Sequence, residues 1–233
     1  MSEDISPIPL LTDCHTHRKC EGAIVCVDPT EVAGLVAGCP SMLLSVGIHP
    51  WDTAGITADE LAEKINRLES VASLPQVVAI GEAGLDGLRG GDAGVQTEAL
   101  RSQIILSERV GKPLILHVVR SGHRVMALCR EMERVLKPAG LRQPWIWHGF
   151  RGGAEEAARF LALRKENYIS VGSRHNQAAL SAIPPDRLLI ETDDSALPIR
   201  EVAGVVAAAL ALTEEEVVRI ASRNLDRIIG RGE

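Results

Sequence analysis

Eight short runs of apolar residues recur along the chain, each bounded by polar or turn-forming residues. Continuous apolar runs of this length are typical of strands that are buried on both faces of a sheet. The predicted strands comprise residues 8–14, 23–28, 41–48, 76–82, 113–118, 144–147, 167–172 and 187–192.

Several of the connecting segments have the pattern of amphipathic helices. Thr57 and Glu60 form a capping box ahead of an apolar face, and so do Thr213 and Glu216. Gly230 is placed to close the second of these helices, because glycine adopts the backbone conformation found just beyond a helix end. These signals predict helices with defined starts between strands.

Strands that alternate with helices predict an α/β fold with a parallel sheet. The pattern over residues 95–110 adds another helix, which ends at Gly111 directly before the next strand. Eight such strands favour a closed (β/α)8 TIM barrel that spans residues 1–233 as a single domain, with a doubly wound open sheet as the alternative. The connection after the first strand is too short for a full helix, so we expect a trimmed barrel.

Composition and net charge limit the fold classes and the binding partners that the chain can have. Of 233 residues, 45% are hydrophobic but only 3% are aromatic, which indicates an aliphatic core and argues against an all-β sandwich. The net charge of −6 gives no general attraction to nucleic acid or anionic membranes, so any phosphate recognition must be local. We recognise no signal peptide, no membrane span and no obligate protein partner.

The five cysteines are odd in number and form no Cys-x-x-Cys pair. This usage fits a reduced, cytoplasmic setting. Cys14 lies between histidine and acid positions, which raises the possibility of a thiolate ligand or nucleophile. We favour the simpler interpretation, a small buried residue.

Histidines and acids gather where the predicted strands end. In strand order, these residues are Asp13, His15 and His17, then His49, Glu82 and Asp86, His117 and Arg120, His148, and finally Glu191, Asp193 and Asp194. The carboxyl ends of barrel strands surround one mouth, where barrel enzymes place their active sites.

Each of these residues also has a structural interpretation when taken alone. A single histidine is more often a hydrogen-bonded core residue, Glu82 could pair with an arginine, and Asp193 could cap the next helix. Together, however, imidazoles and acids at one mouth need a compensating cation. We therefore predict a metal site. His123 is expected at the surface or behind the site, and His175 is a further candidate for the mouth.

The ordered strand-end motifs resemble those of the TatD family of metal-dependent hydrolases and deoxyribonucleases, nearly from end to end. The motifs are Asp-x-His-x-His at 13–17, Gly-Ile-His-Pro at 47–50, Gly-Glu-x-Gly-Leu-Asp at 81–86, His-x-x-Arg at 117–120, His-Gly-Phe at 148–150 and Glu-Thr-Asp at 191–193. Any one of them alone would be weak, and their common order makes the resemblance specific.

The resemblance implies two divalent metal ions as cofactors. The implied ligands of the first ion are His15, His17, Glu82 and Asp193. Glu82 would bridge to a second ion, which is held by His117 and His148. Mixed imidazole and carboxylate ligands suit Zn, Mn, Fe or Co, whereas Mg prefers more oxygen.

The same resemblance implies a phosphodiester substrate, in particular DNA cleaved from a 3′ end. His49 would bind substrate phosphate or assist proton transfer, and Arg120 is placed to contact an anionic group bidentately. Asp193 is the candidate general base because it would touch both metal and water. The predicted catalytic residues are thus Asp193, Glu82 and His49.

Some features of the chain depart from what a nuclease would need. Asp194 adds an acid where many relatives turn apolar, and no aromatic platform follows Asp86. Sequence-tolerant binding of single strands normally uses stacking aromatics over a basic groove. Only Trp51, Trp147 and Phe150 lie near the motifs. The candidate phosphate contacts are Arg18, Lys19, Arg120, Arg124, Arg151 and Arg174.

Three alternatives to a phosphodiesterase stay open. An amidohydrolase-type enzyme that cleaves C–N or ester bonds also begins with a His-x-His strand, although the strand-end motifs here contain no lysine of the kind that often becomes carbamylated. A phosphoesterase of the polymerase and histidinol-phosphatase type usually closes with Asp-x-His, which is absent after Asp193. The third alternative is a catalytically silent metal-binding scaffold.

Overall fold

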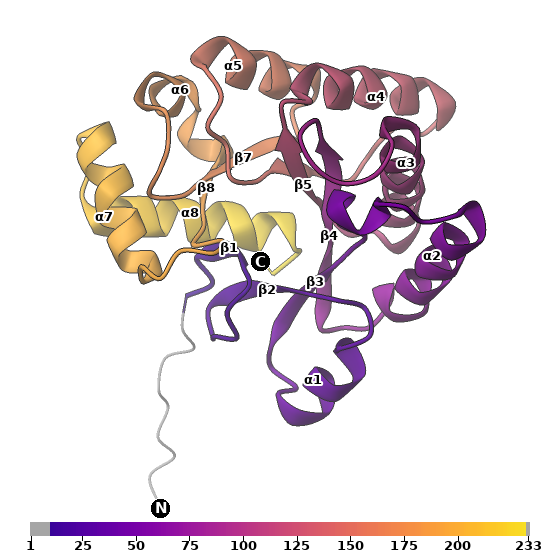
Figure 1. The fold of residues 1–233 in the computed structure, drawn as a ribbon. Helices are drawn as coiled ribbons and strands as arrows, with labels where there is room; N and C mark the ends of the chain where they lie inside the picture. Colours follow the sequence, from indigo (N-terminus) through magenta and orange to yellow (C-terminus); the bar gives the residue numbers. More distant parts are fainter. Residues whose placement is uncertain (1–9, 232–233) are drawn as a thin grey trace, which may run out of the picture.

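Eight parallel strands form a closed barrel in the computed structural model, which describes residues 10–231 (Figure 1). The strands follow one another around the barrel in chain order. They are β1 (Asp13–Thr16), β2 (Ala23–Val27), β3 (Leu43–Val46), β4 (Val77–Asp86), β5 (Leu114–Val119), β6 (Trp145–Trp147), β7 (Tyr168–Val171) and β8 (Leu188–Ile190). The prediction of a (β/α)8 barrel is confirmed.

Helices surround the strands on the outside of the barrel (Figure 1). Within residues 10–231 they are α1 (Val32–Gly38), α2 (Ala58–Ala72), α3 (Ala93–Val110), α4 (Gly122–Val135), α5 (Ala154–Leu163), α6 (Gln177–Ala182), α7 (Ile199–Leu210) and α8 (Glu214–Ile228). Two short 3₁₀ turns, η1 (Pro50–Thr53) and η2 (Pro185–Arg187), complete the described elements. Among these helices, none is both long and apolar enough to cross a membrane.

The helix signals in the sequence are confirmed at their ends. The Thr57 hydroxyl accepts the Glu60 N–H at the start of α2, and the Glu60 carboxylate accepts the Thr57 N–H in return. α3 ends at Gly111, whose φ of +69° is the left-handed conformation that favours glycine. Gly230, with φ +73°, follows the end of α8 in the same way.

The first strand differs from its prediction. Residues 8 and 9 lie outside the described part of the chain, and regular pairing begins at Asp13 and runs to Thr16. The strand therefore includes His15 and ends one residue before His17, because Thr16 pairs with Val25 of β2 and forms a bridge with Asp193. No helix separates β1 from β2 in this part of the chain, so the predicted trimming of the barrel is confirmed.

The fourth strand continues four residues beyond its predicted end at Glu82. It runs to Asp86, which lies opposite Val119 of β5, so the prediction of a strand end at Glu82 was wrong. Close packing of the two strands explains the extension. A Cβ on Gly84 would overlap the His117 carbonyl oxygen, so only glycine allows this approach.

The buried apolar residues form two clusters separated by the sheet. The interior cluster takes Ile24, Ala79, Ile115, Ile146 and Leu189 from five different strands. Their neighbours along the strands belong to a larger outer cluster that packs beneath the helices. Because successive side chains on a strand point to opposite faces, this alternation identifies which residues face the barrel interior.

Candidate metal centre

A cavity of about 980 Å³ opens at the carboxyl ends of the strands. Its wall includes five of the predicted ligands, namely His17, Glu82, His117, His148 and Asp193, together with His49 and Arg120. The sixth predicted ligand, His15, is fully buried directly behind them. The structure thus brings all of the predicted site residues to one mouth.

Pairing across the closing seam of the barrel places His15, His17 and Asp193 together. The Asp193 N–H donates to the His15 carbonyl at 3.0 Å, and the His17 N–H donates to the Asp193 carbonyl at 3.4 Å. Asp193 has a φ of +52°, a left-handed conformation that non-glycine residues seldom adopt. One carboxylate oxygen of Asp193 lies 3.6 Å from Nε2 of each histidine.

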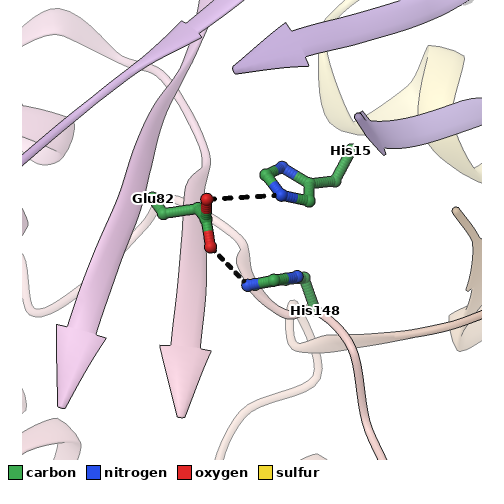
Figure 2. A group of neighbouring side chains, drawn as sticks. All are labelled: His15, Glu82 and His148. Atoms are coloured by element: carbon green, nitrogen blue, oxygen red, sulfur yellow. Dashed lines mark ion pairs between the residues drawn. The ribbon is translucent and has the colours of Figure 1, made fainter. Parts of the chain in front are cut away.

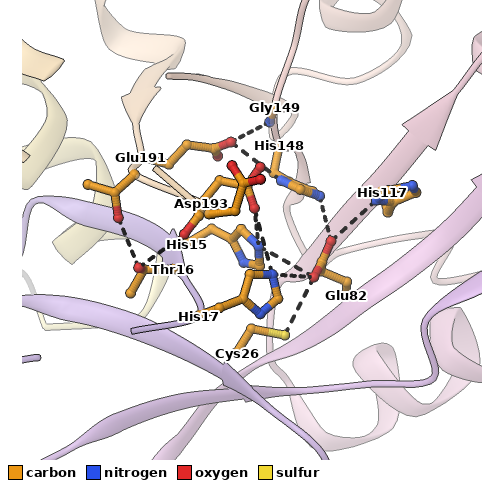
Figure 3. Close-up of polar contacts among 12 residues, drawn as sticks. His15, Thr16, His17, Cys26, Glu82, His117, His148, Gly149, Glu191 and Asp193 are labelled. Carbon is orange, nitrogen blue, oxygen red and sulfur yellow. Dashed lines mark hydrogen bonds and ion pairs between the residues drawn. The ribbon is translucent and has the colours of Figure 1, made fainter. Parts of the chain in front are cut away.

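The Glu82 carboxylate lies at the centre of the cluster (Figure 3). Its Oε2 is 3.5 Å from His15 Nε2 and 3.2 Å from His17 Nε2. Its Oε1 is 2.9 Å from His148 Nε2 and 3.3 Å from His117 Nδ1. Each oxygen of this one carboxylate therefore faces a different pair of imidazoles.

The chemistry of the buried groups fits divalent cations. Neither His15 nitrogen has a hydrogen-bond partner among the described residues, nor does His148 Nε2, although these atoms are buried. Figure 2 shows both rings directed at Glu82. Unpartnered buried nitrogens that converge on a carboxylate are the arrangement expected of metal ligands, because a nitrogen lone pair in such a place needs a hydrogen-bond donor or a cation.

Electrostatics supports the same conclusion. Burial raises the pKa of Glu82, but the positive charges of His15 and His148 outweigh burial and leave this pKa well below its usual range. Burial and His148 lower the pKa of His15, but the Glu82 charge prevails and raises this pKa to about 9. The carboxylates thus attract positive charge into the centre, and a divalent cation can replace the protons.

Two carboxylates behind the cluster orient its imidazoles, and sequence reasoning gave them no role. Glu191 Oε1 accepts the Gly149 N–H at 2.6 Å and lies 3.4 Å from His148 Nδ1. Asp86 Oδ2 lies 3.3 Å from His117 Nε2. Each leaves the nitrogen that faces Glu82 available as a ligand, as supporting carboxylates do in metal sites. Glu191 and Asp86 both belong to the strand-end motifs, and this was the signal in the sequence that could have identified them as supporting residues.

Asp13 is a third buried acid behind the histidines, and it links β1 to the segment after β8. Asp13 accepts the Thr192 hydroxyl at 2.6 Å and the Thr192 N–H at 3.0 Å. Burial raises the pKa of Asp13 to about 6.

Cys14, the residue after Asp13, is fully buried and contacts the Ser170 hydroxyl at 3.0 Å. Burial raises the pKa of this thiol, which supports its interpretation as a core residue.

His49 is placed beside the cluster as a neutral donor. Its Nδ1 accepts the Trp51 N–H at 3.2 Å, which leaves the proton of the neutral ring on Nε2, 3.7 Å from Glu82 Oε1. Burial lowers the pKa of His49 to about 4. A ring that carries its proton toward the centre suits binding of an anionic oxygen better than metal ligation.

The predicted phosphate contacts separate into two groups. Lys19, Arg120 and Arg151 line the cavity. The others are directed to protein groups: Arg18 to the Ala196 and Leu197 carbonyls, Arg124 to the Ala93 carbonyl, and Arg174 to Asp194 at 3.7 Å.

Two other candidates lie apart from the centre. His123 is exposed at the start of α4, as expected. His175 Nδ1 lies 3.1 Å from the Gly172 carbonyl oxygen, and His175 is not among the described residues that line the cavity. The structure therefore does not place His175 at the mouth, since the turn after β7 directs the ring back to that strand.

The aromatic residues near the motifs also differ from one another. Trp147 and Phe150 are buried and pack edge to face, whereas Trp51 is 44% exposed on the cavity wall. The Trp51 Nε1–H donates to Asp86 Oδ2 at 2.7 Å, so this ring is held in place.

Comparison with known proteins identifies the family. A family model described as TatD related DNase matches residues 19–230. The metal-dependent hydrolase YabD of Bacillus subtilis is 29% identical over 205 residues, which cover 79% of this chain and 76% of that protein.

Exonucleases are also among the similar proteins. The 3'-5' ssDNA/RNA exonuclease TatD of Edwardsiella piscicida is 33% identical over 68% of this chain, and that of Cronobacter sakazakii is 36% identical over 71%. The matches cover 60% and 61% of those two proteins, so this chain spans less than two thirds of their length.

Solved structures share the barrel. The TatD homolog YjjV from Escherichia coli has a TM-score of 0.72 at 24% identity, over 88% of this chain and 85% of that one. A TatD family hydrolase from Entamoeba histolytica has a TM-score of 0.73 at 18% identity, over 96% and 99%. Given the model match along most of its length, the chain belongs to the TatD family of metal-dependent hydrolases.

Proposed function

We propose that the protein is a two-metal phosphodiesterase that removes nucleotides from the 3′ end of single-stranded nucleic acid, with DNA as the expected substrate. The proposed ligands of one cation are His15, His17, Glu82 and Asp193. Glu82, His117 and His148 would hold the second. The activity of the exonuclease relatives supports the choice of substrate.

The placement of Glu82 carries this proposal. A carboxylate whose two oxygens face separate pairs of imidazoles, at 2.9–3.5 Å, can serve two cations at once. Its side chain is only 6% exposed, so water cannot readily compensate its charge. A single-metal site would leave one of the two imidazole pairs without a ligand role.

Two cations held close together would activate a water molecule and stabilise the negative charge that develops on the phosphate. Asp193 is our candidate for the general base. Its side chain is 28% exposed, more than that of Glu82, so it is accessible to a water molecule in the cavity. Burial raises the pKa of Asp193, but His15 and His148 lower it by more, which keeps this carboxylate ionised.

Residues on the cavity wall would position the substrate. The Nε2–H of His49 and the guanidinium of Arg120 are available to donate to phosphate oxygens. The rim limits how much of a polyanion can bind, because Asp28, Glu31 and Asp52 line the same cavity. Contacts with one or two phosphates at the end of a single nucleic-acid chain fit this charge distribution better than contacts along a duplex.

The test is cleavage of a 5′-labelled single-stranded oligonucleotide by protein reconstituted with Zn²⁺, Mn²⁺, Co²⁺ or Mg²⁺. We expect stepwise shortening from the 3′ end, and loss of nearly all turnover in Glu82→Ala and Asp193→Asn. His123→Ala, at an exposed position, is the matched control and should keep wild-type activity. Full activity in Glu82→Ala would overturn the bridging role.

The same preparation separates the alternatives. Turnover of amide, ester or lactone substrates without cleavage of the oligonucleotide would indicate an amidohydrolase-type enzyme. Tight binding of two cations without turnover of any substrate would indicate a silent scaffold. Elemental analysis of the purified protein identifies the native cations and their number.

A further inference from the structure

Cys26 lies on the wall of the metal centre, although its position in the sequence gave no indication of it. It is the fourth residue of β2, two positions after Ile24 of the interior cluster. Val25 and Val27, on either side of it, belong to the outer cluster. The strand alternation therefore directs the Cys26 side chain inward, at the cavity end of the barrel.

The Cys26 sulfur lies close to the other proposed ligands of the first cation. Its Sγ is 3.8 Å from Glu82 Oε2, the same oxygen that faces His15 and His17 (Figure 3). The ligand atoms of His17, Cys26 and Glu82 all lie within 4.8 Å of one another. Zn–S bonds of about 2.3 Å and Zn–O bonds of about 2.0–2.2 Å place neighbouring sulfur and oxygen ligands roughly 3.0–3.7 Å apart, whether the ion has four or five ligands.

An independent observation points to a cation at this place. His15 is fully buried, has no hydrogen-bond partner for either nitrogen among the described residues, and directs Nε2 at the Glu82 oxygen that Cys26 also contacts. The cysteine thus borders a position defined by other groups. The Gly81 carbonyl oxygen, 3.7 Å from Sγ, is a further polar neighbour of this sulfur.

We propose that Cys26 supplies a thiolate ligand to the cation held by His15, His17, Glu82 and Asp193. The sulfur gives up its proton to solvent on binding, and the carboxylates and imidazoles complete the coordination. A thiolate adds a soft ligand, which favours Zn²⁺ or Co²⁺ over Mg²⁺ at this site. This inference rests on the proposed metal centre and adds a seventh ligand to it.

The first test is titration of the metal-free protein with Co²⁺, followed by absorption spectroscopy. The wild-type protein should develop a near-ultraviolet charge-transfer band from thiolate to Co²⁺. Cys26→Ser should lose this band and keep the weaker visible bands of Co²⁺ in an imidazole and carboxylate site. Cys39→Ser, which changes an exposed cysteine outside the cavity, is the matched control and should keep the charge-transfer band.

A second measurement does not depend on the folding of any variant. The X-ray absorption spectrum of the zinc-loaded wild-type protein should contain one sulfur neighbour at about 2.3 Å per protein molecule, which is about half a sulfur per zinc ion when two are bound. A spectrum with only nitrogen and oxygen neighbours, or a charge-transfer band that survives in Cys26→Ser, would overturn the proposal. Cys26 would then be a thiol that donates a hydrogen bond to Glu82.

Failure of this inference differs from failure of the proposed function. The spectroscopic readouts need no substrate, and oligonucleotide cleavage needs no sulfur ligand. A protein that cleaves DNA without a sulfur neighbour would contradict only the role of Cys26. A protein with the sulfur neighbour but without cleavage would contradict only the nuclease.

Discussion

Single side chains behind the candidate metal centre orient its imidazoles. Glu191 is buried at 1% exposure and accepts from both Gly149 and His148. Glu191→Gln keeps the size of the side chain but removes the charge that fixes the His148 tautomer. We expect affinity for the second cation to fall by about 10- to 100-fold.

Calorimetric titration with Zn²⁺ measures this change in Glu191→Gln. Glu98→Gln, an exposed acid on α3, is the matched control and should titrate like the wild-type protein. Unchanged affinity for both cations in Glu191→Gln would show that the Gly149 N–H alone orients His148.

At this scale much of the candidate site could be predicted from the sequence. The six proposed ligands are each adjacent to a strand end or within a strand motif, so local patterns locate them. Cys26 could not be found in this way, because its role depends on which face of β2 points inward and on a carboxylate 56 residues away. The position of His175 stayed open in the sequence for a similar reason, because it depends on the direction of a turn that no pattern encodes.

At the scale of elements, the contact between β4 and β5 positions Glu82 against His117. A Cβ on Gly84 would overlap the His117 carbonyl oxygen, so Gly84→Ala must push the strands apart. We expect a loss of stability of about 1–3 kcal/mol from the overpacking, together with weaker cation binding.

Urea unfolding of Gly84→Ala measures this cost, with Gly34→Ala as its matched control. Gly34 lies in α1, where an added Cβ would have nothing within 4 Å, so alanine there should stabilise the protein by about 0.5–1 kcal/mol. Equal stability of the two variants would mean that the strands tolerate the methyl group by local adjustment.

Element boundaries were the weaker part of the sequence prediction. Helix starts and ends follow local chemistry at Thr57 and Gly111, and they were predicted correctly. The ends of β1 and β4 depend on pairing with segments distant in the chain, such as Asp193 for Thr16 and Val119 for Asp86. Apolar patterns contain no information on such partners.

At the scale of the whole molecule, cation binding should stabilise the barrel. The proposed ligands lie in or just after β1, β4, β5, β6 and β8, so the cations would join five strands and would reduce the repulsion between Glu82 and Asp193. Binding that is confined to the folded state adds about 2.7 kcal/mol at a free cation concentration roughly 100 times Kd.

Thermal unfolding with and without a chelator measures this contribution. We expect the chelator to lower the melting temperature of the wild-type protein, and to change that of Glu82→Ala little or not at all. An identical melting temperature in the wild-type protein with and without cations would indicate that they bind too weakly to couple with folding.

The seam between β1 and the segment after β8 has a consequence for how the protein is made. Thr16 and Asp193 are separated by 177 residues, yet their pairing holds His15 and Asp193 at the same cation site. A chain still emerging from the ribosome has its early histidines long before their acidic partner exists. The proposed metal centre therefore cannot form before synthesis has passed residue 193, so any activity that depends on this centre can begin only late in synthesis.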